Sequence, residues 1–447
     1  MMSKKYYIET YGCQMNFADT EVVASILAKS GFKPAEDAGS ADLIMVNTCS
    51  IRDNAEQRVW GRLDYFRSIK RKRPAVVIGV LGCMAERLRE QLLESDKKVD
   101  LVVGPDAYRD LPSLVTAAGD GHKAVNVLLS REETYADISP VRTDSNGVSA
   151  FISIMRGCNN MCAYCVVPYT RGAERSRDPL SVVSEAKELF DAGYREVTLL
   201  GQNVDSYNWQ PDNETDKHVS FADLIKMVAG ISPLLRVRFS TNHPKDLSDD
   251  LLQTMAEHTN ICRHIHLPVQ SGSTGMLKRM NRKYTREWYL GRVDAIKRFM
   301  PDCTISTDII AGFCGESEEE HTDTLSLMKE VGFDFAYMFK YSERPGTRAA
   351  RHYKDDVPEE TKTKRLNEII NLQNRLSAAC KKKDIGKTFE VLVEGEAKKP
   401  ISGRTMTGRT SGNKVVVFES VDAKPGNYVM VTVEKATSAT LTGRICI

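Results

Sequence analysis

Short apolar runs alternate with helical periodicity along the first third of the chain. Three of these runs stop in the same way, because YYIETYGCQMN reaches Cys13, ADLIMVNTCSIRDN reaches Cys49 and AVVIGVLGCMAE reaches Cys83. Apolar residues at helical spacing follow the last two cysteines: Ala55, Val59, Leu63 and Phe66 after the first, and Met84, Leu88 and Leu92 after the second. Repeated strand and helix predict a parallel sheet with helices on its faces. We therefore predict an N-terminal α/β domain over residues 1–130.

The middle of the chain predicts a second α/β domain. A polar stretch over residues 131–149 has the composition of an interdomain linker. Over residues 150–380, helical patterns separate six strand candidates: AFISIMRG, EVTLLG, RVRFS, RHIHLP, CTISTDIIAGF and DFAYMFKYS. Six such units are too few for a closed eight-stranded barrel. We predict a partial (βα)6 barrel, open on one side, with its functional face at the carboxyl ends of the strands.

The pattern changes again near residue 384, where TFEVLVEG, KVVVFES and NYVMVTVEKAT are separated by glycine-containing turns. These strands predict a small all-β barrel of the general oligonucleotide-binding kind over residues 381–447. The segment holds 12 Lys+Arg against 7 Asp+Glu, whereas the whole chain has a formal net charge of only +2. Any nucleic-acid surface is therefore local, and we expect it at this end.

The most informative feature of the composition is the number of cysteines. The chain has 447 residues, 41% of them hydrophobic, which is enough for two or three cores. No apolar run approaches a membrane span, and MMSKKYYIET contains no apolar signal core, so we expect a soluble cytoplasmic protein without membrane partners. In a reducing compartment, grouped cysteines among a total of 11 favour metal binding or catalysis over disulfides.

The strongest chemical signal is the segment RGCNNMCAYCVVPYTRGAERSR. It holds Cys158, Cys162 and Cys165 in the spacing C-x3-C-x2-C, directly after the first strand of the predicted partial barrel. Three thiolates on one tight loop can bind a [4Fe-4S] cluster and leave one iron without a protein ligand. A zinc loop is the alternative, but zinc usually takes four ligands and no fourth cysteine or histidine lies nearby in the sequence.

This motif, in a (βα)6 pattern, resembles the radical S-adenosylmethionine superfamily. The resemblance implies that the open iron binds the amino and carboxylate groups of S-adenosylmethionine. It implies a reduced cluster that splits this cofactor, giving a 5′-deoxyadenosyl radical that abstracts hydrogen from an unactivated carbon. It also implies that Tyr164, just before the last ligand, packs near the adenine. The cofactor carries this chemistry, and the protein positions it and excludes water.

The three cysteines at strand ends predict a second site. Parallel strands present their carboxyl ends at one edge of a sheet, so Cys13, Cys49 and Cys83 can converge although 35 and 33 residues separate them. Each precedes a helix, whose N-terminus favours an anionic cluster. Any one of them alone would be interpreted as a buried cysteine. Their repetition at corresponding positions favours a second [4Fe-4S] cluster with its own open iron.

With both trios and the C-terminal barrel, the whole chain resembles the methylthiotransferase family. That family has an N-terminal cluster domain, a radical S-adenosylmethionine core and a C-terminal TRAM domain, and replaces a C–H bond with C–SCH3. The resemblance implies that the second cluster carries the transferred sulfur and that two S-adenosylmethionine molecules supply the methyl group and the radical. It further implies an unidentified reducing electron donor, and we expect a monomer.

Two features favour one branch of this family. ETYGCQMNFADTE and CAYCVVPYTRGAERSR resemble the branch that modifies C2 of adenosine-37 in tRNA already bearing an N6-dimethylallyl group. The branch acting on threonylcarbamoyladenosine usually has GCKVN at the first ligand, and the branch acting on an aspartate of ribosomal protein S12 usually has GCPKN with an acidic TRAM domain. Both remain alternatives, as does a non-catalytic iron–sulfur sensor that binds tRNA.

Strand ends of the partial barrel provide candidate contacts for S-adenosylmethionine. The candidates are Gln202 and Asn203 in LLGQNV, Gln270 and Ser271 in LPVQSGS, and Gly312 and Phe313 in DIIAGFCGES. Gln202 and Asn203 stand where the superfamily usually has Gly-Glu. Cys262, His264 and His266 alternate along one predicted strand and share a face, for which a place in the barrel core is favoured over a metal site.

The anticodon stem-loop of tRNA is the expected macromolecular partner. Phosphates attract Lys and Arg, and bases in such a loop can be splayed out at little cost. The candidate contacts in the C-terminal module are Lys398, Lys399, Arg404, Arg409 and Lys414. Arg171 and Arg175, with Arg177, are candidates beside the cysteine loop, and a structural role for them is an equal alternative.

Overall fold

The computed structural model describes residues 4–49, 53–94, 96, 98–142, 146–211, 217–399 and 403–446. The chain forms two compact units. The N-terminal unit comprises Met1–Asp144, Met155–Asn159 and Cys165–Ser181. The barrel unit comprises Ser145–Ile154, Asn160–Tyr164 and Val182–Ile447. The chain therefore crosses between the units within the C-x3-C-x2-C loop.

The N-terminal unit is built on a six-stranded sheet in which all strands are parallel, in the order β2-β1-β3-β4-β5-β6. The strands are β1 (Lys5–Tyr11), β2 (Lys33–Pro34), β3 (Leu43–Thr48), β4 (Val77–Gly82), β5 (Leu101–Val103) and β6 (Ala124–Asn126). This confirms the predicted parallel sheet. The order reverses between β1 and β3, which is the topological switch point of a doubly wound fold.

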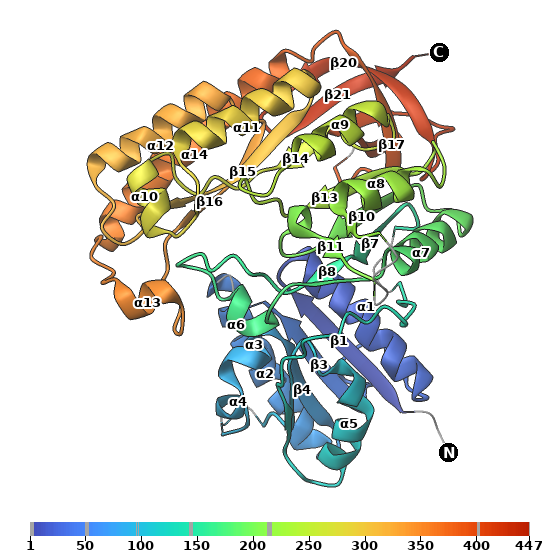
Figure 1. The fold of residues 1–447 in the computed structure, drawn as a ribbon. Helices are drawn as coiled ribbons and strands as arrows, with labels where there is room; N and C mark the ends of the chain where they lie inside the picture. Colours follow the sequence, from blue (N-terminus) through green and yellow to red (C-terminus); the bar gives the residue numbers. More distant parts are fainter. Residues whose placement is uncertain are drawn as a thin grey trace. The chain divides into compact units, whose positions relative to one another are not determined.

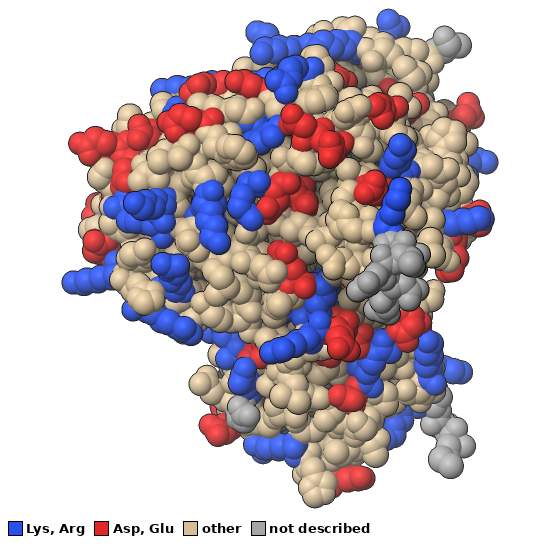
Figure 2. Space-filling view, viewed as in Figure 1, with Lys and Arg blue, Asp and Glu red and all other residues tan. Residues whose placement is uncertain are grey.

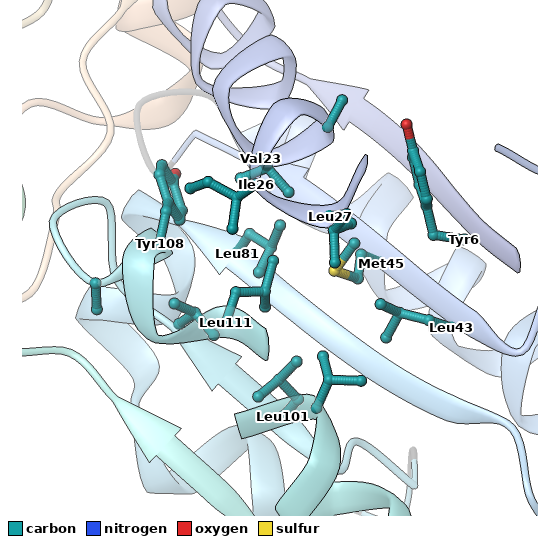
Figure 3. Packing of buried hydrophobic residues seen from close by; sticks show 14 of the residues in the cluster. Tyr6, Val23, Ile26, Leu27, Leu43, Met45, Leu81, Leu101, Tyr108 and Leu111 are labelled. Atoms are coloured by element: carbon teal, nitrogen blue, oxygen red, sulfur yellow. The ribbon is translucent and has the colours of Figure 1, made fainter. Parts of the chain in front are cut away.

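Helices cover both faces of this sheet and enclose two hydrophobic cores. They are α1 (Gln14–Lys29), α2 (Asp53–Lys72), α3 (Cys83–Leu88), α4 (Glu90–Glu94) and α5 (Leu111–Gly119), with a short 3-10 turn at Tyr108–Asp110. Figure 3 shows the first core, in which Leu27 of α1 and Leu111 of α5 pack toward Met45 and Leu101 of the sheet. In the second core, Val59, Leu63 and Phe66 of α2 are fully buried, as their spacing predicts. The side chain of Ala55 lies outside the described residues.

The predicted stripe after Cys83 is interrupted. Arg89 has a φ of 46° and separates α3 from α4. Its guanidinium group donates to the carbonyl oxygen of Glu86 at 3.0 Å and to the carboxylate of Glu86 at 2.9 Å, so it caps the end of α3. Leu92 is nevertheless fully buried, because α4 resumes on the same face of the sheet.

The predicted linker does not run free of the N-terminal unit. Tyr135 and Ile138 are buried in its first core, and the Tyr135 hydroxyl donates to the carbonyl oxygen of Pro105 at 3.0 Å. Arg142 pairs with Glu21 of α1 at 2.6 Å. Residues 131–142 therefore belong structurally to this unit, and positions 143–145 of the predicted linker lie outside the described residues.

The barrel unit contains the six predicted strands, in two parallel sheets of three with orders β13-β10-β7 and β14-β15-β16. These strands are β7 (Ser149–Ser153), β10 (Glu196–Leu200), β13 (Arg236–Ser240), β14 (His264–His266), β15 (Thr304–Ala311) and β16 (Phe335–Lys340). A bridge between Val237 and Ile261 links the sheets beside β13 and β14. Since β7 and β16 are not paired with each other, the prediction of a partial, open barrel is confirmed.

Helices cover the outer side of these strands. Several begin at a serine or threonine whose side chain accepts a backbone N–H, as at Ser248, Thr285 and Ser317. Figure 1 shows α12 and α14 side by side along β15 and β16. The helices of this unit are α8 (Phe221–Ala229), α9 (Asp249–Glu257), α10 (Thr274–Arg279), α11 (Arg286–Phe299), α12 (Glu318–Val331), α13 (Arg348–His352) and α14 (Glu359–Lys382), and α7 (Pro179–Asp191) begins in the N-terminal unit.

The C-terminal module is a closed five-stranded barrel in the order β17-β18-β19-β21-β20. Its strands are β17 (Thr388–Glu396), β18 (Thr405–Thr410), β19 (Val415–Glu419), β20 (Tyr428–Ala436) and β21 (Thr440–Ile445). The sequence pattern missed β18 and β21, because each carries a glycine where a strand usually has a larger residue. A Cβ at Gly408 or Gly443 would lie 2.2 Å from the carbonyl oxygen of Leu392 or Thr432, so close strand packing requires both glycines.

The turn between β18 and β19 docks into the amino-terminal end of the partial barrel. Arg238 of β13 donates to the carbonyl oxygens of Thr410 at 2.7 Å and Ser411 at 3.0 Å, and its Nε pairs with Glu196 at 2.7 Å. Thr304 of β15 donates to the carbonyl oxygen of Gly412 at 2.8 Å. The small barrel thus closes the end opposite to the strands' carboxyl ends.

Among the described residues, none of the helices is long and apolar enough to cross a membrane. On the face drawn in Figure 2, Lys and Arg are interspersed with Asp and Glu. This mixture agrees with a formal net charge near zero.

Candidate functional site

The first cysteine trio lies at the carboxyl edge of the N-terminal sheet. Cys13 follows β1 and is the N-cap residue of α1, Cys49 follows β3, and Cys83 follows β4 as the first residue of α3. Cys13 and Cys49 thus flank the switch point between β1 and β3, where open α/β sheets bind their ligands.

Two glycines allow these cysteines to approach one another. Gly12 has a φ of +132°, and a Cβ there would lie 2.5 Å from the Cβ of Cys49. Gly82 has a φ of +84°, and a Cβ there would lie 2.4 Å from Oδ1 of Asn47. Side chains rarely adopt these backbone conformations and would overlap at both positions, so the turns that present Cys13 and Cys83 require glycine.

A buried pair of asparagines supports the first two cysteines. Sγ of Cys13 donates to Oδ1 of Asn16 at 3.3 Å, and Nδ2 of Asn16 donates to Oδ1 of Asn47 at 3.2 Å. Nδ2 of Asn47 donates in turn to the carbonyl oxygen of Asn16 at 2.9 Å. Sequence reasoning missed both residues, although each stands within three positions of a cysteine as a polar residue in an otherwise apolar stretch.

The surroundings of Cys13 favour its anionic form. A hydrogen bond with Cys49 and the positive charge of Arg171 lower the pKa of Cys13 to about 6, against the opposing effect of burial. The thiolate is the form that binds metal. Among the described residues, no three His, Cys, Asp or Glu side chains converge tightly enough to hold one metal ion. A [4Fe-4S] cluster does not require the three thiolates to converge on one metal ion, because each thiolate binds a different iron atom.

The residues predicted to reach phosphate beside the cysteine loop are buried. Arg171, at the end of α6 (Val167–Arg171), pairs with Asp19 at 2.7 Å, and Arg175 of β9 (Arg175–Ser176) pairs with Asp106 at 3.0 Å. Their side chains are only 3% and 5% exposed. This placement contradicts the predicted phosphate contacts of Arg171 and Arg175. Arg177 is also buried and donates to Ser181, so it too has a structural role.

The second cysteine trio lies on a loop that both units share. In the N-terminal unit, the N–H of Cys158 donates to the carbonyl oxygen of Gly172 at 3.1 Å, and Sγ of Cys165 accepts from the N–H of Val167 at 3.5 Å. A Cβ at Gly157, whose φ is +79°, would lie 1.9 Å from the carbonyl oxygen of Ala173. The loop therefore closes tightly beside Cys158.

In the barrel unit, an arginine that sequence reasoning missed lies against Cys162. Nη1 of Arg282 is 3.3 Å from Sγ of Cys162 and 3.4 Å from the hydroxyl of Tyr164. Arg282 is 4% exposed, and it also donates to the carbonyl oxygen of Pro268 and the hydroxyl of Tyr284. Its only signal in the sequence is a place in the basic segment KRMNRK. A buried positive charge therefore lies directly beside this candidate cluster ligand.

Polar atoms without partners gather at the carboxyl ends of β10 and β13. Both amide atoms of Gln202 and the Oδ1 atoms of Asn203 and Asn242 are buried and have no hydrogen-bond partner. Nδ2 of Asn203 donates to Asp246 at 2.8 Å. Burial raises the pKa of Asp205, which accepts from Asn242 at 2.6 Å, to about 7. Unsatisfied buried amides are typical of a site shaped for a polar ligand.

The other predicted cofactor contacts divide into two groups. Gln270 is buried with a φ of +71° and pairs with Ile309 of β15, so it lies at the predicted strand end. The hydroxyl of Ser271 is fully buried and shares a hydrogen bond with Thr324 of α12, so its geometry favours a role in the turn over ligand contact.

Gly312 and Phe313 are explained by packing. A Cβ at Gly312, whose φ is +71°, would lie 2.4 Å from Cγ of Lys362 in α14, so the glycine permits this helix to approach. Phe313 is fully buried and packs edge-on against Tyr341 at 4.9 Å between ring centroids. Tyr164 packs against the same hydrophobic cluster.

The inner face of β14–β16 combines polar and aromatic side chains. His264 and His266 each share a hydrogen bond with Ser306 at 2.9 Å, which explains their alternation. Tyr337 contacts the His266 ring and lies on the same side of β16 as Phe335 and Phe339, opposite the buried Ala336. The three aromatic side chains are 46%, 48% and 38% exposed, in chain order, and so remain available to a ligand.

The predicted basic surface of the C-terminal barrel is reduced by internal ion pairs. Arg404 pairs with Glu396 and Arg409 with Glu394, both at 3.0 Å. Lys414 is 14% exposed and pairs with Asp384 at 2.6 Å. Lys398 and Lys399, by contrast, are exposed at the end of the segment after β17.

Comparison with known proteins assigns a family to each part of the chain. Residues 5–104 match a family described as "Uncharacterized protein family UPF0004", residues 152–328 match the Radical SAM superfamily, and residues 382–446 match the TRAM domain. A protein of Amoebophilus asiaticus named tRNA-2-methylthio-N(6)-dimethylallyladenosine synthase is 59% identical over 454 residues, covering 100% of this chain and 93% of the relative. The chain belongs to the tRNA-2-methylthio-N(6)-dimethylallyladenosine synthase family. A second relative of this name, from Phocaeicola vulgatus, is 57% identical and covers 99% of this chain and 96% of its own length.

Solved structures with the same fold include two other radical enzymes. One is the methyltransferase TsrM from Kitasatospora setae with cobalamin and a [4Fe-4S] cluster bound, at a TM-score of 0.55 and 14% identity over 76% of this chain and 75% of that one. The other is the cobalamin-dependent enzyme OxsB, at a TM-score of 0.53 and 15% identity over 83% of this chain and 56% of that one. At these identities the likeness concerns the fold alone.

Membership of the tRNA-2-methylthio-N(6)-dimethylallyladenosine synthase family, within the Radical SAM superfamily, implies one [4Fe-4S] cluster and S-adenosylmethionine. The residues fit both. A three-cysteine loop with a buried arginine beside Cys162 suits a cluster. The unpartnered amide of Gln202 and the unpartnered Oδ1 of Asn203 suit the polar groups of the cofactor.

Proposed function

We propose that this protein methylthiolates C2 of N6-dimethylallyladenosine at position 37 of tRNA. The observation that carries the proposal is the coexistence of two cysteine trios, one in a radical S-adenosylmethionine loop and one at the switch point of the N-terminal sheet. The names of relatives that match the full chain at 57–59% identity support the same substrate. A tRNA substrate agrees with a cytoplasmic location and with the TRAM domain at the C-terminus.

In this proposal the second trio, Cys158, Cys162 and Cys165, holds the cluster that acts with S-adenosylmethionine. When bound, these two groups supply a radical able to remove hydrogen from an unactivated carbon. Arg282 donates to Cys162, and Gln202 and Asn203 orient the cofactor's polar groups at the carboxyl ends of the strands. Gln270 lies at the same face, and Tyr164 and Phe313 form the apolar wall behind it.

The first trio, Cys13, Cys49 and Cys83, holds an auxiliary [4Fe-4S] cluster in this proposal. The lowered pKa of Cys13 and the rigid asparagine pair prepare these thiols for binding iron. The auxiliary cluster would supply the sulfur, and a separate reductant would supply electrons.

For the substrate, we propose that the exposed Lys398 and Lys399 contact phosphates of the anticodon stem-loop and that Phe335, Tyr337 and Phe339 receive the unstacked adenine. Aromatic rings bind single-stranded bases by stacking, and their apolar surface also suits a dimethylallyl chain. Gly312 contributes indirectly, because it allows α14 to pack behind the edge of the barrel.

Iron content tests the two-cluster arrangement. Anaerobically reconstituted protein is expected to hold about eight iron atoms, and about four after replacement of Cys158, Cys162 and Cys165 by Ala. The matched variant in which Cys13, Cys49 and Cys83 become Ala should also hold about four. If the variant of Cys13, Cys49 and Cys83 keeps the full iron content, the proposal of an auxiliary cluster is wrong.

A substrate comparison separates this function from its alternatives. The reconstituted enzyme is given stem-loop RNA with N6-dimethylallyladenosine, RNA with threonylcarbamoyladenosine, and ribosomal protein S12. We expect methylthiolation of the first alone. Modification of the protein alone would refute the tRNA proposal, and binding of S-adenosylmethionine without formation of 5′-deoxyadenosine would indicate a non-catalytic sensor.

A further inference from the structure

The N-terminal unit contains a buried ionic network with an excess of positive charge. Arg156 pairs with Asp19 at 2.8 Å and approaches Asp106 at 3.4 Å. Arg171 pairs with the other oxygen of Asp19, and Arg175 pairs with Asp106. The five side chains are at most 5% exposed. Three guanidinium groups therefore share two carboxylates in a medium where an unbalanced charge is costly.

Neighbouring buried carboxylates do not cancel this excess. Glu86 of α3 also lies near Asp106, but it pairs with Arg89 of its own helix at 2.9 Å. Burial raises the pKa of Glu86 to about 7, so it holds less negative charge near neutral pH than an ordinary glutamate. The three guanidinium groups and two carboxylates of the network therefore keep an excess of one positive charge.

Arg171 is the member of the network that interacts electrostatically with Cys13 and Cys83. Its Nη2 donates to Asp19, whereas its buried Nη1 has no hydrogen-bond partner. Asp19 lies on α1, the helix that Cys13 caps, and α6, which ends at Arg171, packs against α3, the helix that begins at Cys83. Burial would lower the pKa of Arg171, but Asp19 and then the Cys83 and Cys13 thiols raise it.

We propose that Arg171 is a positioning residue for the auxiliary cluster, and that its free N–H donates to the anionic cluster assembled on Cys13, Cys49 and Cys83. The inference rests on the proposed function, because it requires that second cluster. Arg171 lies six residues after Cys165, the last cysteine of the C-x3-C-x2-C loop. The short helix α6 therefore connects that loop to the residue proposed to interact with the auxiliary cluster. Donated hydrogen bonds and nearby positive charge stabilise the reduced, more negative state of an iron–sulfur cluster.

The test isolates the auxiliary cluster in the full-length protein by replacing Cys158, Cys162 and Cys165 with Ala. In that background, Arg171→Gln removes the charge, Arg171→Lys keeps it, and Arg175→Gln removes a different arginine of the same network as a matched control. Iron content, thermal stability and the reduction potential of the cluster, followed by electron paramagnetic resonance, are measured for each.

We expect Arg171→Gln to shift the potential to a more negative value, or to lose the cluster iron while it remains folded. The reduction potential and iron content of Arg171→Lys should lie between those of Arg171→Gln and the parent. Arg175→Gln should keep the iron content and reduction potential of the parent even if it is less stable. Equal potentials and equal iron in the Arg171→Gln and Arg175→Gln variants would overturn the inference and assign Arg171 a purely structural role. Absence of iron from the parent itself would instead overturn the two-cluster function, so the two failures are distinguishable.

Discussion

At the scale of single residues, the candidate ligands could be predicted from sequence but their supports could not. Six cysteines are visible because their spacing and their places at strand ends repeat. The roles of Asn47, Arg171 and Arg282 follow only from contacts that span 31 to 152 positions of the chain. Their partners are Asn16, Asp19 and Cys162, respectively. For Arg171 and Arg175 the sequence left phosphate contact and a structural role equally open, and their buried ion pairs favour the structural role. The sequence could not decide between them, because the buried partner of a charged residue is not visible in it.

The turn before Cys83 yields a prediction with an internal control. Gly31 and Gly82 share a φ of +84°, but a Cβ at Gly31 would meet nothing within 4 Å, whereas at Gly82 it would lie 2.4 Å from Asn47. Gly31→Ala should lower the free energy of unfolding by about 1–2 kcal/mol, because alanine disfavours this backbone conformation. Gly82→Ala should cost more than about 3 kcal/mol and lower auxiliary-cluster iron. Thermal unfolding and iron analysis check this, and equal effects of the two changes would contradict it.

Glu86 gives a prediction about pH. Its pKa is raised to about 7 in the folded protein by burial, whereas an unfolded glutamate titrates near about 4.3. The folded state therefore binds the proton more tightly, and this contribution to stability is lost as pH rises from about 4 to about 7. The side chain in Glu86→Gln stays neutral at every pH. Relative to wild type, the free energy of unfolding of this variant should therefore increase by up to about 3 kcal/mol across that pH range.

Thermal unfolding of the iron-free protein at several pH values measures this gain. Loss of the pair with Arg89, whose side chain is 54% exposed, should matter little. A difference between variant and wild type that does not change with pH would show that Glu86 is ionised throughout.

At the scale of elements, the strands of both α/β regions follow from sequence because apolar runs and helical spacing alternate. The hydrophobic pattern did not predict β18 and β21. Their glycines, Gly408 and Gly443, are required by close packing against a neighbouring strand, and the local sequence does not show which strand that is. The predicted linker fails differently. Its polar composition is real, but Tyr135 and Ile138 bury enough apolar surface to bind residues 131–142 to the N-terminal unit.

The docking of the small barrel gives a prediction at this scale. Arg238 is buried between Glu196 and two carbonyl oxygens of the β18–β19 turn, so Arg238→Met would leave a buried carboxylate without its partner. We expect a loss of about 3–5 kcal/mol. Arg404→Met, which removes a pair with Glu396 whose side chains are 39% and 69% exposed, should cost less than about 1 kcal/mol. Urea unfolding checks both, and similar losses would contradict the assigned role of Arg238.

At the scale of the whole molecule, the chain joins a doubly wound sheet, a partial barrel and a small closed barrel. The order of these parts could be predicted from sequence, because each has its own hydrophobic period. The division into two units could not, since the C-x3-C-x2-C loop contributes residues to both. Because the chain crosses between the units within this loop, Arg171 belongs to the N-terminal unit, whereas Cys162 and Arg282 belong to the barrel unit.

Mass spectrometry of tRNA after turnover tests whether this protein methylthiolates N6-dimethylallyladenosine. Reconstituted enzyme, a reductant and S-adenosylmethionine labelled in its methyl group are incubated with tRNA that carries N6-dimethylallyladenosine at position 37. We expect that this nucleoside alone gains one sulfur and one labelled methyl group at C2, with 5′-deoxyadenosine formed in the same reaction. Unmodified tRNA after demonstrated loading of both clusters would contradict it.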